Sequence, residues 1–379
     1  MNRDILSLDF YGEGITAALA SLDERTDTLR IRHIVRQPCR ALSGAFVRDI
    51  SGARDALSHV LTEMDPYMQG SVSVVVGVRG SFLSFRRGTG FINPAARNHI
   101  IHESDIEEVI HASLPSNLSE SLEVVDIYPQ SYTIDDQAGV IDPCGMQGYC
   151  LEAQTFISLG VGSHLANLNH VLSACGCEDY LLLPTVLALG ETVLTPTEKA
   201  ATALLVDIGE SGTSALLYHK DMLLEAWELP CSLEQTAEEV ADLLQNDIAT
   251  ARQLLRTYEP DPVMDELLED ACAPMVQALH KELVHSLNYI QHPPTHLILC
   301  GQGANTVFLR VLKNKLATRK ARLCSFDHLI ADCDADLPVY NGALALLDHA
   351  LTREQNQLGV AQVKQEGILG KLFSKFGLN

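Results

Sequence analysis

The sequence has few of the features that mark nucleic-acid-binding, membrane-spanning or metal-binding proteins. Its 379 residues include 27 Lys and Arg against 49 Asp and Glu, which gives a formal net charge of -22. This balance argues against nucleic acid as a partner, because phosphate-reading surfaces need clustered basic side chains. No run approaches the roughly 18 apolar residues that read as a membrane-spanning helix. The CxxC, HExxH and GxSxG patterns are also missing, so the sequence predicts no metal site and no serine hydrolase.

The composition is that of a globular protein. Hydrophobic residues make up 46% of the chain and charged residues 20%, and the length predicts several compact units. The ten cysteines are scattered, with only Cys175 and Cys177 close together. We interpret them as reduced core thiols of a cytoplasmic protein.

One short pattern occurs twice, and it predicts two related half-domains that face one cleft. The first copy is ILSLDFYGEGITAALA, residues 5–20, and the second is ALLVDIGESGTSALLY, residues 203–218. Asp9 aligns with Asp207, and Gly14 aligns with Gly212. A turn of this kind can hold phosphate oxygens on its backbone N–H groups, while the aspartate holds a metal-bound water. Two ordinary hairpins are the alternative, because Asp and Gly are common turn residues.

Apolar spacing and turn residues predict the main elements along the chain. A helix is expected over 51–64, a strand over 72–78, and a helix over 105–114 with Ser104 as its N-cap. The remaining expectations are strands near 123–132 and 151–159, a helix over 163–175, helical segments over 233–258 and 261–289 with a break near Pro274, and a strand, glycine turn and helix over 295–309.

Several motifs occur in a fixed order along the chain. The most specific is IDPCGMQGYCLEAQTFIS, residues 141–158. The others are SVVVGVRGSFLSF at 73–85, VDIG at 206–209, the turn at Gly301, and LPVYNGALALL at 337–347. By their order and spacing, these motifs together resemble bacterial FtsA, an actin-like cell division family in which a segment similar to 141–158 closes an inserted subdomain. The resemblance runs nearly end to end.

The resemblance implies an α/β fold: a duplicated actin-like, ribonuclease H-like core with an inserted subdomain of the SHS2 type. The implied divisions are subdomain 1A at 1–70 and 159–190, subdomain 1C at 71–158, subdomain 2A at 191–229 and 293–350, and a shortened subdomain 2B at 230–292. It also implies self-association, divisome partners for subdomain 1C, and FtsZ as a partner of subdomain 2B. The region near Tyr258 is shorter than in relatives, so no FtsZ contact residues are assigned.

The resemblance further implies a nucleotide site, with ATP and magnesium as possible ligands. Its candidate residues are Asp9, Gly12, Gly14, Asp207, Gly209, Gly212, Thr213, Gly301 and Gly303. The loops depart from the family pattern, however: Tyr11 is bulky, and Glu13 and Glu210 place carboxylates where phosphate would lie. Like charges about 4 Å apart cost about 4 kcal/mol at an effective dielectric near 20. Arg252 and Leu255 stand where relatives carry Glu and Lys, so we expect ATP binding to be weak or lost.

The last residues predict an amphipathic helix that binds the inner membrane. Within 367–379, lysines group on one side of a helical wheel, and five apolar side chains fall within an arc of about 140 degrees on the opposite side: Ile368, Leu369, Leu372, Phe373 and Phe376. The expected membrane-binding residues are Ile368, Leu369, Lys371, Leu372, Phe373, Lys375 and Phe376. A polar linker over 351–366 would let this helix leave the folded body. A helix docked on the protein's own core is the alternative.

Three classes of function remain open from the sequence. The first is a peripheral adaptor on the cytoplasmic face of the inner membrane, which tethers FtsZ filaments at the division septum and polymerises. The second is a PilM-like scaffold of type IV pilus assembly, which shares the fold. The third is an active actin-like ATPase or sugar kinase, for which neither Glu13 nor Glu210 can be assigned as the catalytic carboxylate.

Overall fold

The computed structural model describes residues 4–23, 28–68, 72–95, 98–257, 262–333 and 337–355. Two compact units are distinguished within it. The first comprises 1–82 with 166–349, and the second comprises 83–165 with the chain from 350 onward. The linker beyond 355 and the expected membrane helix at 367–379 lie outside the described residues.

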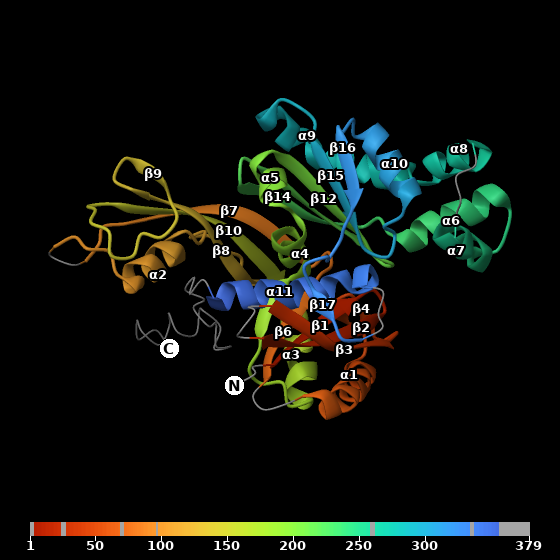
Figure 1. Cartoon of the computed structure of the whole chain (residues 1–379), viewed down its shortest axis with the longest axis horizontal. Coiled ribbons are helices and arrows are strands. Elements are labelled where there is room, and N and C mark those ends of the chain that lie inside the picture. Colours follow the sequence, from red (N-terminus) through yellow and green to blue (C-terminus); the bar gives the residue numbers. More distant parts are fainter. Residues whose placement is uncertain are drawn as a thin grey trace. The chain divides into compact units, whose positions relative to one another are not determined.

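The first unit contains two sheets, visible in Figure 1. One has the strand order β11-β6-β1-β2-β3-β17. Its strands are β1 (Asp4–Tyr11), β2 (Gly14–Asp23), β3 (Thr28–Pro38), β6 (Val72–Val78), β11 (Leu181–Pro184) and β17 (Ile330–Ala331). The central strand β1 is buried along its whole length, as expected where both faces of a sheet are covered. A small hairpin of β4 (Leu42–Ser43) and β5 (Phe46–Val47) stands beside it.

The other sheet repeats this topology, in the order β14-β13-β12-β15-β16. Its strands are β12 (Thr202–Ile208), β13 (Thr213–His219), β14 (Met222–Leu229), β15 (His296–Cys300) and β16 (Lys320–Leu323). In both sheets, the strand that bears the aspartate pairs antiparallel with the next strand and parallel with a later one. The duplicated core is therefore confirmed.

Helices cover the sheets of the first unit. They are α1 (Ile50–Met64), α3 (Gly162–Ala174), α4 (Thr185–Val193), α5 (Pro196–Ala200), α6 (Leu233–Leu244), α7 (Ile248–Thr257), α8 (Pro262–Ala271), α9 (Ala273–Ile290), α10 (Thr306–Lys315) and α11 (Asn341–Gln355), with 3-10 turns at Asp65–Tyr67 and Leu337–Tyr340. Figure 1 shows α6, α7 and α8 as one helical group beside α10. Their apolar faces pack around Leu268, Leu279 and Phe308. The described residues between 230 and 292 are mostly helical and contain no strand.

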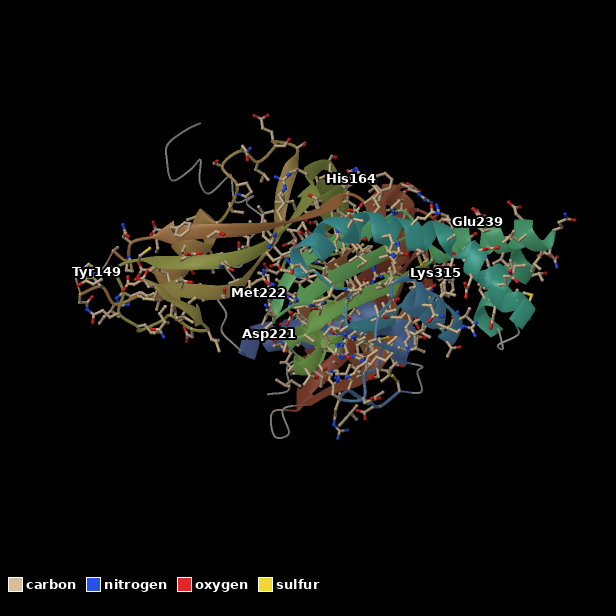
Figure 2. The ribbon with its side chains drawn as sticks, turned by 90° about the horizontal axis from the view of Figure 1, so that it is seen from above. Tyr149, His164, Asp221, Met222, Glu239 and Lys315 are labelled. Atoms are coloured by element: carbon tan, nitrogen blue, oxygen red, sulfur yellow. The ribbon has the colours of Figure 1, made fainter. Side chains whose placement is uncertain are left out.

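The second unit is built on the sheet β7-β10-β8-β9. Its elements are β7 (Leu83–Ile92), α2 (Glu103–Ala112), β8 (Leu122–Ile134), β9 (Gln137–Val140) and β10 (Leu151–Val161). A small core around Ile101, Val109 and Leu151 joins α2 to the sheet. The ring of Tyr149 is exposed and lies against His99 at the end of this sheet (Figure 2).

Two segments lie in a different sheet from the one predicted. The expected insertion at 71–158 began with the strand at 72–78, but β6 pairs in parallel with β1 and so belongs to the first sheet. The insertion therefore begins after Val78. The short β17, expected within subdomain 2A, pairs with β3 and also joins the first sheet.

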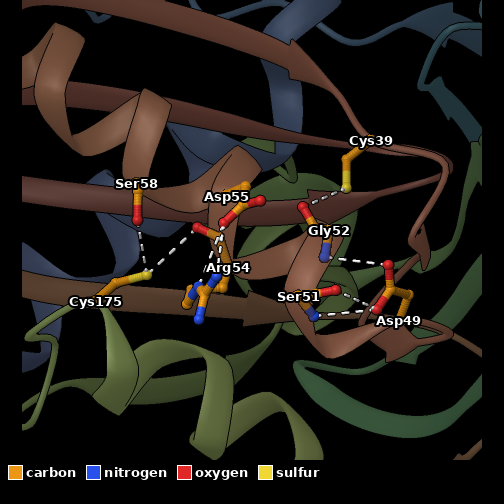
Figure 3. A network of polar contacts seen from close by, with 8 residues as sticks. All are labelled: Cys39, Asp49, Ser51, Gly52, Arg54, Asp55, Ser58 and Cys175. Atoms are coloured by element: carbon orange, nitrogen blue, oxygen red, sulfur yellow. Dashed lines mark hydrogen bonds and ion pairs between the residues drawn. The ribbon is translucent and has the colours of Figure 1, made fainter.

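Helix boundaries follow local capping. The Asp49 carboxylate accepts hydrogen bonds from the backbone N–H groups of Ser51 and Gly52, at 3.1 and 3.2 Å, and so begins α1 (Figure 3). Cys175, just beyond α3, contacts α1 through the Ser58 hydroxyl and the Arg54 carbonyl. These contacts hold α3 against α1.

Two helix predictions needed correction. Helix α2 begins after His102 rather than Ser104, because the Asp105 carboxylate accepts from the His102 backbone N–H at 2.8 Å. The helix expected over 233–258 is divided, because Gln245 adopts a left-handed conformation with φ of 51° and ends α6.

Candidate functional site

The repeat places two buried aspartates at equivalent positions. On β1, Asp9 lies opposite Thr16 of β2, and on β12, Asp207 lies opposite Ser214 of β13. This register agrees with the alignment of the two sequence copies. The side chains of Asp9 and Asp207 are about 5% and 1% exposed.

One arginine side chain binds both aspartates. Arg79 follows β6, and its Nη2 donates to both Asp9 carboxylate oxygens, at 2.9 and 3.2 Å. Its Nη1 donates to Asp207 Oδ2 at 2.7 Å. Burial alone would lower the pKa of Arg79, but the Asp9 and Asp207 carboxylates outweigh this and raise it. The guanidinium therefore stays charged and joins the two sheets.

The remaining oxygens of the two aspartates also accept hydrogen bonds from protein groups. Thr185 Oγ1, at the start of α4, donates to Asp9 Oδ1 at 3.0 Å. Asn341 Nδ2, at the start of α11, donates to Asp207 Oδ1 at 2.9 Å. Burial raises the pKa of Asp9, while Arg79 and Thr185 oppose the shift. Each carboxylate oxygen thus has a donor within the chain.

Glycines on two elements make room for this cluster. A Cβ added at Gly342 would lie 2.2 Å from Asp9 Oδ2 and 2.4 Å from Arg79 Nη2. One added at Gly77 would lie 2.6 Å from Thr185 Oγ1. These glycines let β6 and α11 approach the charged groups directly. Protein atoms therefore fill the space around the ion bridge, the cluster in which Arg79 binds Asp9 and Asp207.

The first predicted phosphate turn faces the second. Gly12 has φ of 35°, and a Cβ there would lie 3.5 Å from the Glu210 Cβ. The Tyr11 hydroxyl accepts a hydrogen bond from Arg36 Nε, and a Cβ at Gly14 would meet that hydroxyl at 2.5 Å. The absence of side chains at Gly12 and Gly14 therefore lets this turn pack closely against Glu210 and the Tyr11 hydroxyl.

The second turn is closed by its own backbone. The Gly209 N–H donates to the Gly212 carbonyl at 2.9 Å, and the Gly209 carbonyl accepts from the Leu233 N–H at 3.0 Å. Thr213 is fully buried on β13. This pairing occupies the Gly209 amide that the sequence assigned to phosphate.

The glycine turn after β15 packs against the end of β12. Gly301 has φ of 89°, and a Cβ there would lie 2.4 Å from the Ile208 carbonyl oxygen. A Cβ at Gly303 would lie 2.5 Å from Ile208 Cγ2. A side chain at either position would collide with Ile208, so both turn positions need glycine.

Three residues that differ from the family's nucleotide-site pattern make contacts within the protein. Glu13 forms an ion pair with Arg48 at 3.0 Å, on the surface. Arg252 Nε donates to Glu234 Oε2 at 2.8 Å, which links α7 to α6. Leu255 is buried in the core. These side chains are committed to the protein's own packing.

A further carboxyl group lies beside the bridge. Glu228 Oε2, on β14, accepts from the Gly80 N–H at 3.1 Å and from the Ser214 hydroxyl at 2.8 Å. Burial raises the pKa of Glu228 to about 7, against the opposing effects of Ser214 and Arg79. At neutral pH this group is therefore near its titration midpoint.

This shift predicts a pH dependence of stability. The folded state binds the Glu228 proton more tightly than the unfolded state, so the stabilisation is present at low pH and is lost as pH rises toward about 7. Relative to Glu228→Gln, the wild type should lose about 2 kcal/mol between about pH 5 and about pH 8, measured by urea unfolding. Glu239→Gln, on the exposed face of α6 (Figure 2), is the control. If the difference in unfolding free energy between the wild type and Glu228→Gln stays constant with pH, the raised pKa of Glu228 is contradicted.

A magnesium–nucleotide complex does not fit this arrangement. Mg²⁺ prefers octahedral oxygen ligands and retains water, whereas the Asp9 and Asp207 oxygens already have protein donors. Among the described residues, no group of three or more His, Cys, Asp or Glu side chains could hold a metal ion. The cluster of Arg79, Asp9 and Asp207 is therefore an internal ion bridge.

The sequence reasoning brought Asp9 and Asp207 together but missed the residue that joins them. Arg79 lies within the motif at 73–85, and no role was predicted for it. The structure pairs Gly77 with Asp9 and Cys300 with Asp207, so Arg79 is the counterpart of Gln302, two residues beyond the paired position. This equivalence depends on strand pairing, which the sequence alone did not show.

The inserted sheet matches a known family domain. Residues 80–158 match the SHS2 domain inserted in FtsA. Over 257 residues, the chain is 22% identical to the cell division protein FtsA of Neisseria meningitidis, and over 255 residues it is 25% identical to that of Pseudomonas aeruginosa. These alignments cover 68% and 67% of the chain. They span only 61% and 60% of the two relatives.

Solved structures share the fold. A PilM–PilN type IV pilus biogenesis complex matches with a TM-score of 0.63 at 17% identity, over 93% of this chain and 99% of that one. MreB5 of Spiroplasma citri bound to ADP matches with a TM-score of 0.51 at 10% identity, over 94% and 99% of the two chains.

The fold and the inserted domain define an actin-like protein with an SHS2 insertion. Within that class, the chain is similar to the cell division protein FtsA over about two thirds of its length, which confirms the resemblance found in the motifs. In the described ranges, no helix is long and apolar enough to cross a membrane.

Proposed function

We propose that this protein is an FtsA-like adaptor in bacterial cell division. It tethers FtsZ filaments to the cytoplasmic face of the inner membrane at the septum, and it self-associates as an actin-like polymer. The observation that carries the proposal is the SHS2 insertion of the FtsA type within a duplicated actin-like core. In this role the folded body couples partners and does not turn over ATP.

The membrane contact is assigned to the C-terminal sequence. Burying five large apolar side chains contributes at most about 1.5–3 kcal/mol each, and each lysine near an anionic surface adds about 1 kcal/mol. Helix formation and immobilisation offset several kcal/mol of this gain. One copy therefore binds reversibly, whereas a polymer binds by avidity.

The last described helix supports this placement of the tail. Within the second unit, Arg353 near the end of α11 binds both Asp126 carboxylate oxygens, at 2.9 and 2.6 Å. Both side chains are largely buried, so the ion pair anchors the helix to β8. Arg353 lies within 351–366, the range predicted as a polar linker, but residues 351–355 are the end of α11, so the prediction is wrong at the start of that range.

The inserted sheet is proposed to contact divisome partners and neighbouring copies. Phe91, Ile141 and Tyr149 are 60%, 89% and 66% exposed on this unit. Contiguous exposed apolar patches mark protein–protein contacts, and these three side chains are the candidates for such a patch on this unit. FtsZ is proposed to bind the helical region at 230–292, with no contact residue assigned.

Vesicle flotation with FtsZ filaments tests the tether. The intact protein should float with anionic vesicles and carry FtsZ with it, whereas a protein that lacks 367–379 should leave both in the dense fraction. Phe373→Asp, on the apolar face, should abolish flotation, because a charge there opposes insertion. Val360→Asp, the same kind of change in the linker, is the matched control. Equal flotation of the intact and truncated proteins would sink the proposal.

A scaffold role in pilus assembly is the second candidate, because the PilM structure matches nearly the full length of both chains. At 17% identity, this match is evidence of a shared fold only. Flotation of the protein without recruitment of FtsZ, together with binding to a PilN peptide, would favour this candidate. Steady ATP hydrolysis by the purified protein would favour the remaining candidate, an active ATPase.

A further inference from the structure

We propose that Arg79 is a built-in substitute for a bound divalent cation, so that the two halves of the core are held together without metal or nucleotide. The inference rests on the proposed function, in which this site is degenerate. It also makes a positive claim: removal of the Arg79 guanidinium creates a divalent-cation site between Asp9 and Asp207.

The contacts match those that a bridging cation would make. One end of the guanidinium is 2.9 Å from Asp9 Oδ2, and the other is 2.7 Å from Asp207 Oδ2. The planar fork of arginine suits such two-sided binding of carboxylates. A single positive charge thus contacts the carboxylates of both repeat copies, as a shared metal ion would, although it balances only one of their two negative charges.

The surroundings leave an external ion little access. The Arg79 side chain is 13% exposed, and the two aspartates are more deeply buried. Opposite charges attract more strongly where water is excluded. Because the guanidinium is part of the chain, its local concentration does not depend on the medium. Millimolar magnesium therefore competes poorly with it.

The same contacts predict what happens when the guanidinium is removed. Asp9 and Asp207 would then face one another in a buried site, where Thr185 and Asn341 remain as hydrogen-bond donors to them. Two uncompensated buried carboxylates are unfavourable. A divalent cation relieves this repulsion, and the space vacated by the arginine head group gives it room for water ligands.

Titration with Mn²⁺ in the absence of nucleotide tests the inference. The wild type should bind no Mn²⁺ at millimolar concentration, by calorimetry and electron paramagnetic resonance. Arg79→Ser should bind about one Mn²⁺ per chain, and its melting temperature, lowered by the loss of the bridge, should rise with Mn²⁺. The wild-type melting temperature should not respond.

Two further variants define the site. Arg79→Ser combined with Asp207→Asn should lose the added Mn²⁺ binding. Arg322→Ser is the matched control, because Arg322 forms a comparable two-point ion pair with Glu198, at 2.8 and 2.7 Å, in the same unit. Its loss should lower the melting temperature and leave Mn²⁺ binding unchanged from the wild type.

Three outcomes would overturn the inference: Mn²⁺ binding by the wild type as tight as that of Arg79→Ser, a folded Arg79→Ser that ignores Mn²⁺, or retention of the ion after Asp207→Asn. If Arg79→Ser does not fold without added Mn²⁺, the variant is refolded from urea in parallel with Mn²⁺ and with a chelator, and the two recoveries of folded protein are compared. Recovery only with Mn²⁺ supports the inference, and equal failure in both overturns it. Neither vesicles nor FtsZ enters this test, so its failure is distinguishable from failure of the tether.

Discussion

Replacement of Gly342 by alanine should lower the free energy of unfolding by about 3 kcal/mol, because the new methyl group would break the buried ion bridge. The methyl carbon would lie 2.2 Å from Asp9 Oδ2 and 2.4 Å from Arg79 Nη2, distances that no pair of non-bonded atoms tolerates. The Asp9 carboxylate and the guanidinium must then move apart. Urea unfolding at neutral pH measures the loss.

Gly212→Ala is the matched control for this prediction. Gly212 lies in the second repeat turn, its φ is outside the left-handed region, and the nearest atom to an added Cβ is the Leu229 carbonyl oxygen at 3.8 Å. The substitution should change stability by less than about 1 kcal/mol. If Gly342→Ala is as stable as Gly212→Ala, the residues around the ion bridge can accommodate the methyl group and the prediction is wrong.

Gly90→Ala should destabilise the inserted sheet by about 3 kcal/mol, because the added methyl group would collide with main-chain atoms. It would lie 2.0 Å from the Val109 carbonyl oxygen and 2.7 Å from the Ser113 N–H nitrogen. Main-chain atoms of α2 cannot rotate away as a side chain can. The helix must therefore lift from β7, and the hydroxyl pair of Thr155 and Ser113, at 2.8 Å, must break.

Hydrogen exchange distinguishes this local effect from global unfolding. Amides of α2 and β7 should exchange faster in Gly90→Ala, whereas those of the central strands β1 and β12 should keep their protection. Thr89→Ala, at the neighbouring exposed position on β7, should change stability by about 0.5 kcal/mol or less. Unchanged exchange of α2 in Gly90→Ala would argue against the packing described for this interface.

The duplicated core was predictable because its signal is local and repeated. Residues 5–20 and 203–218 align without a gap, and the alignment fixes the register of both hairpins. The inserted domain was recognisable from the motif at 141–158, which lies within the matched family domain. Patterns within about twenty residues were sufficient for both conclusions.

The missed features depend on contacts between distant segments. The role of Arg79 depends on Asp207, a residue 128 positions away, and no local pattern reports such a contact. The boundary of the insertion was misplaced for a related reason: a buried run of valines shows that β6 is a strand, whereas only its pairing with β1 shows which sheet it joins.

The ion bridge also has a consequence for how the newly synthesised protein matures. Arg79 and Asp9 are 70 positions apart, so this half of the bridge can form once β1, β6 and the residues directly after β6 have left the ribosome. Closure onto Asp207 waits for the second sheet and needs no cofactor to be loaded. If Arg79 takes the place of a cation as proposed, the core can close as soon as its second half has been made, with no step at which nucleotide must be loaded.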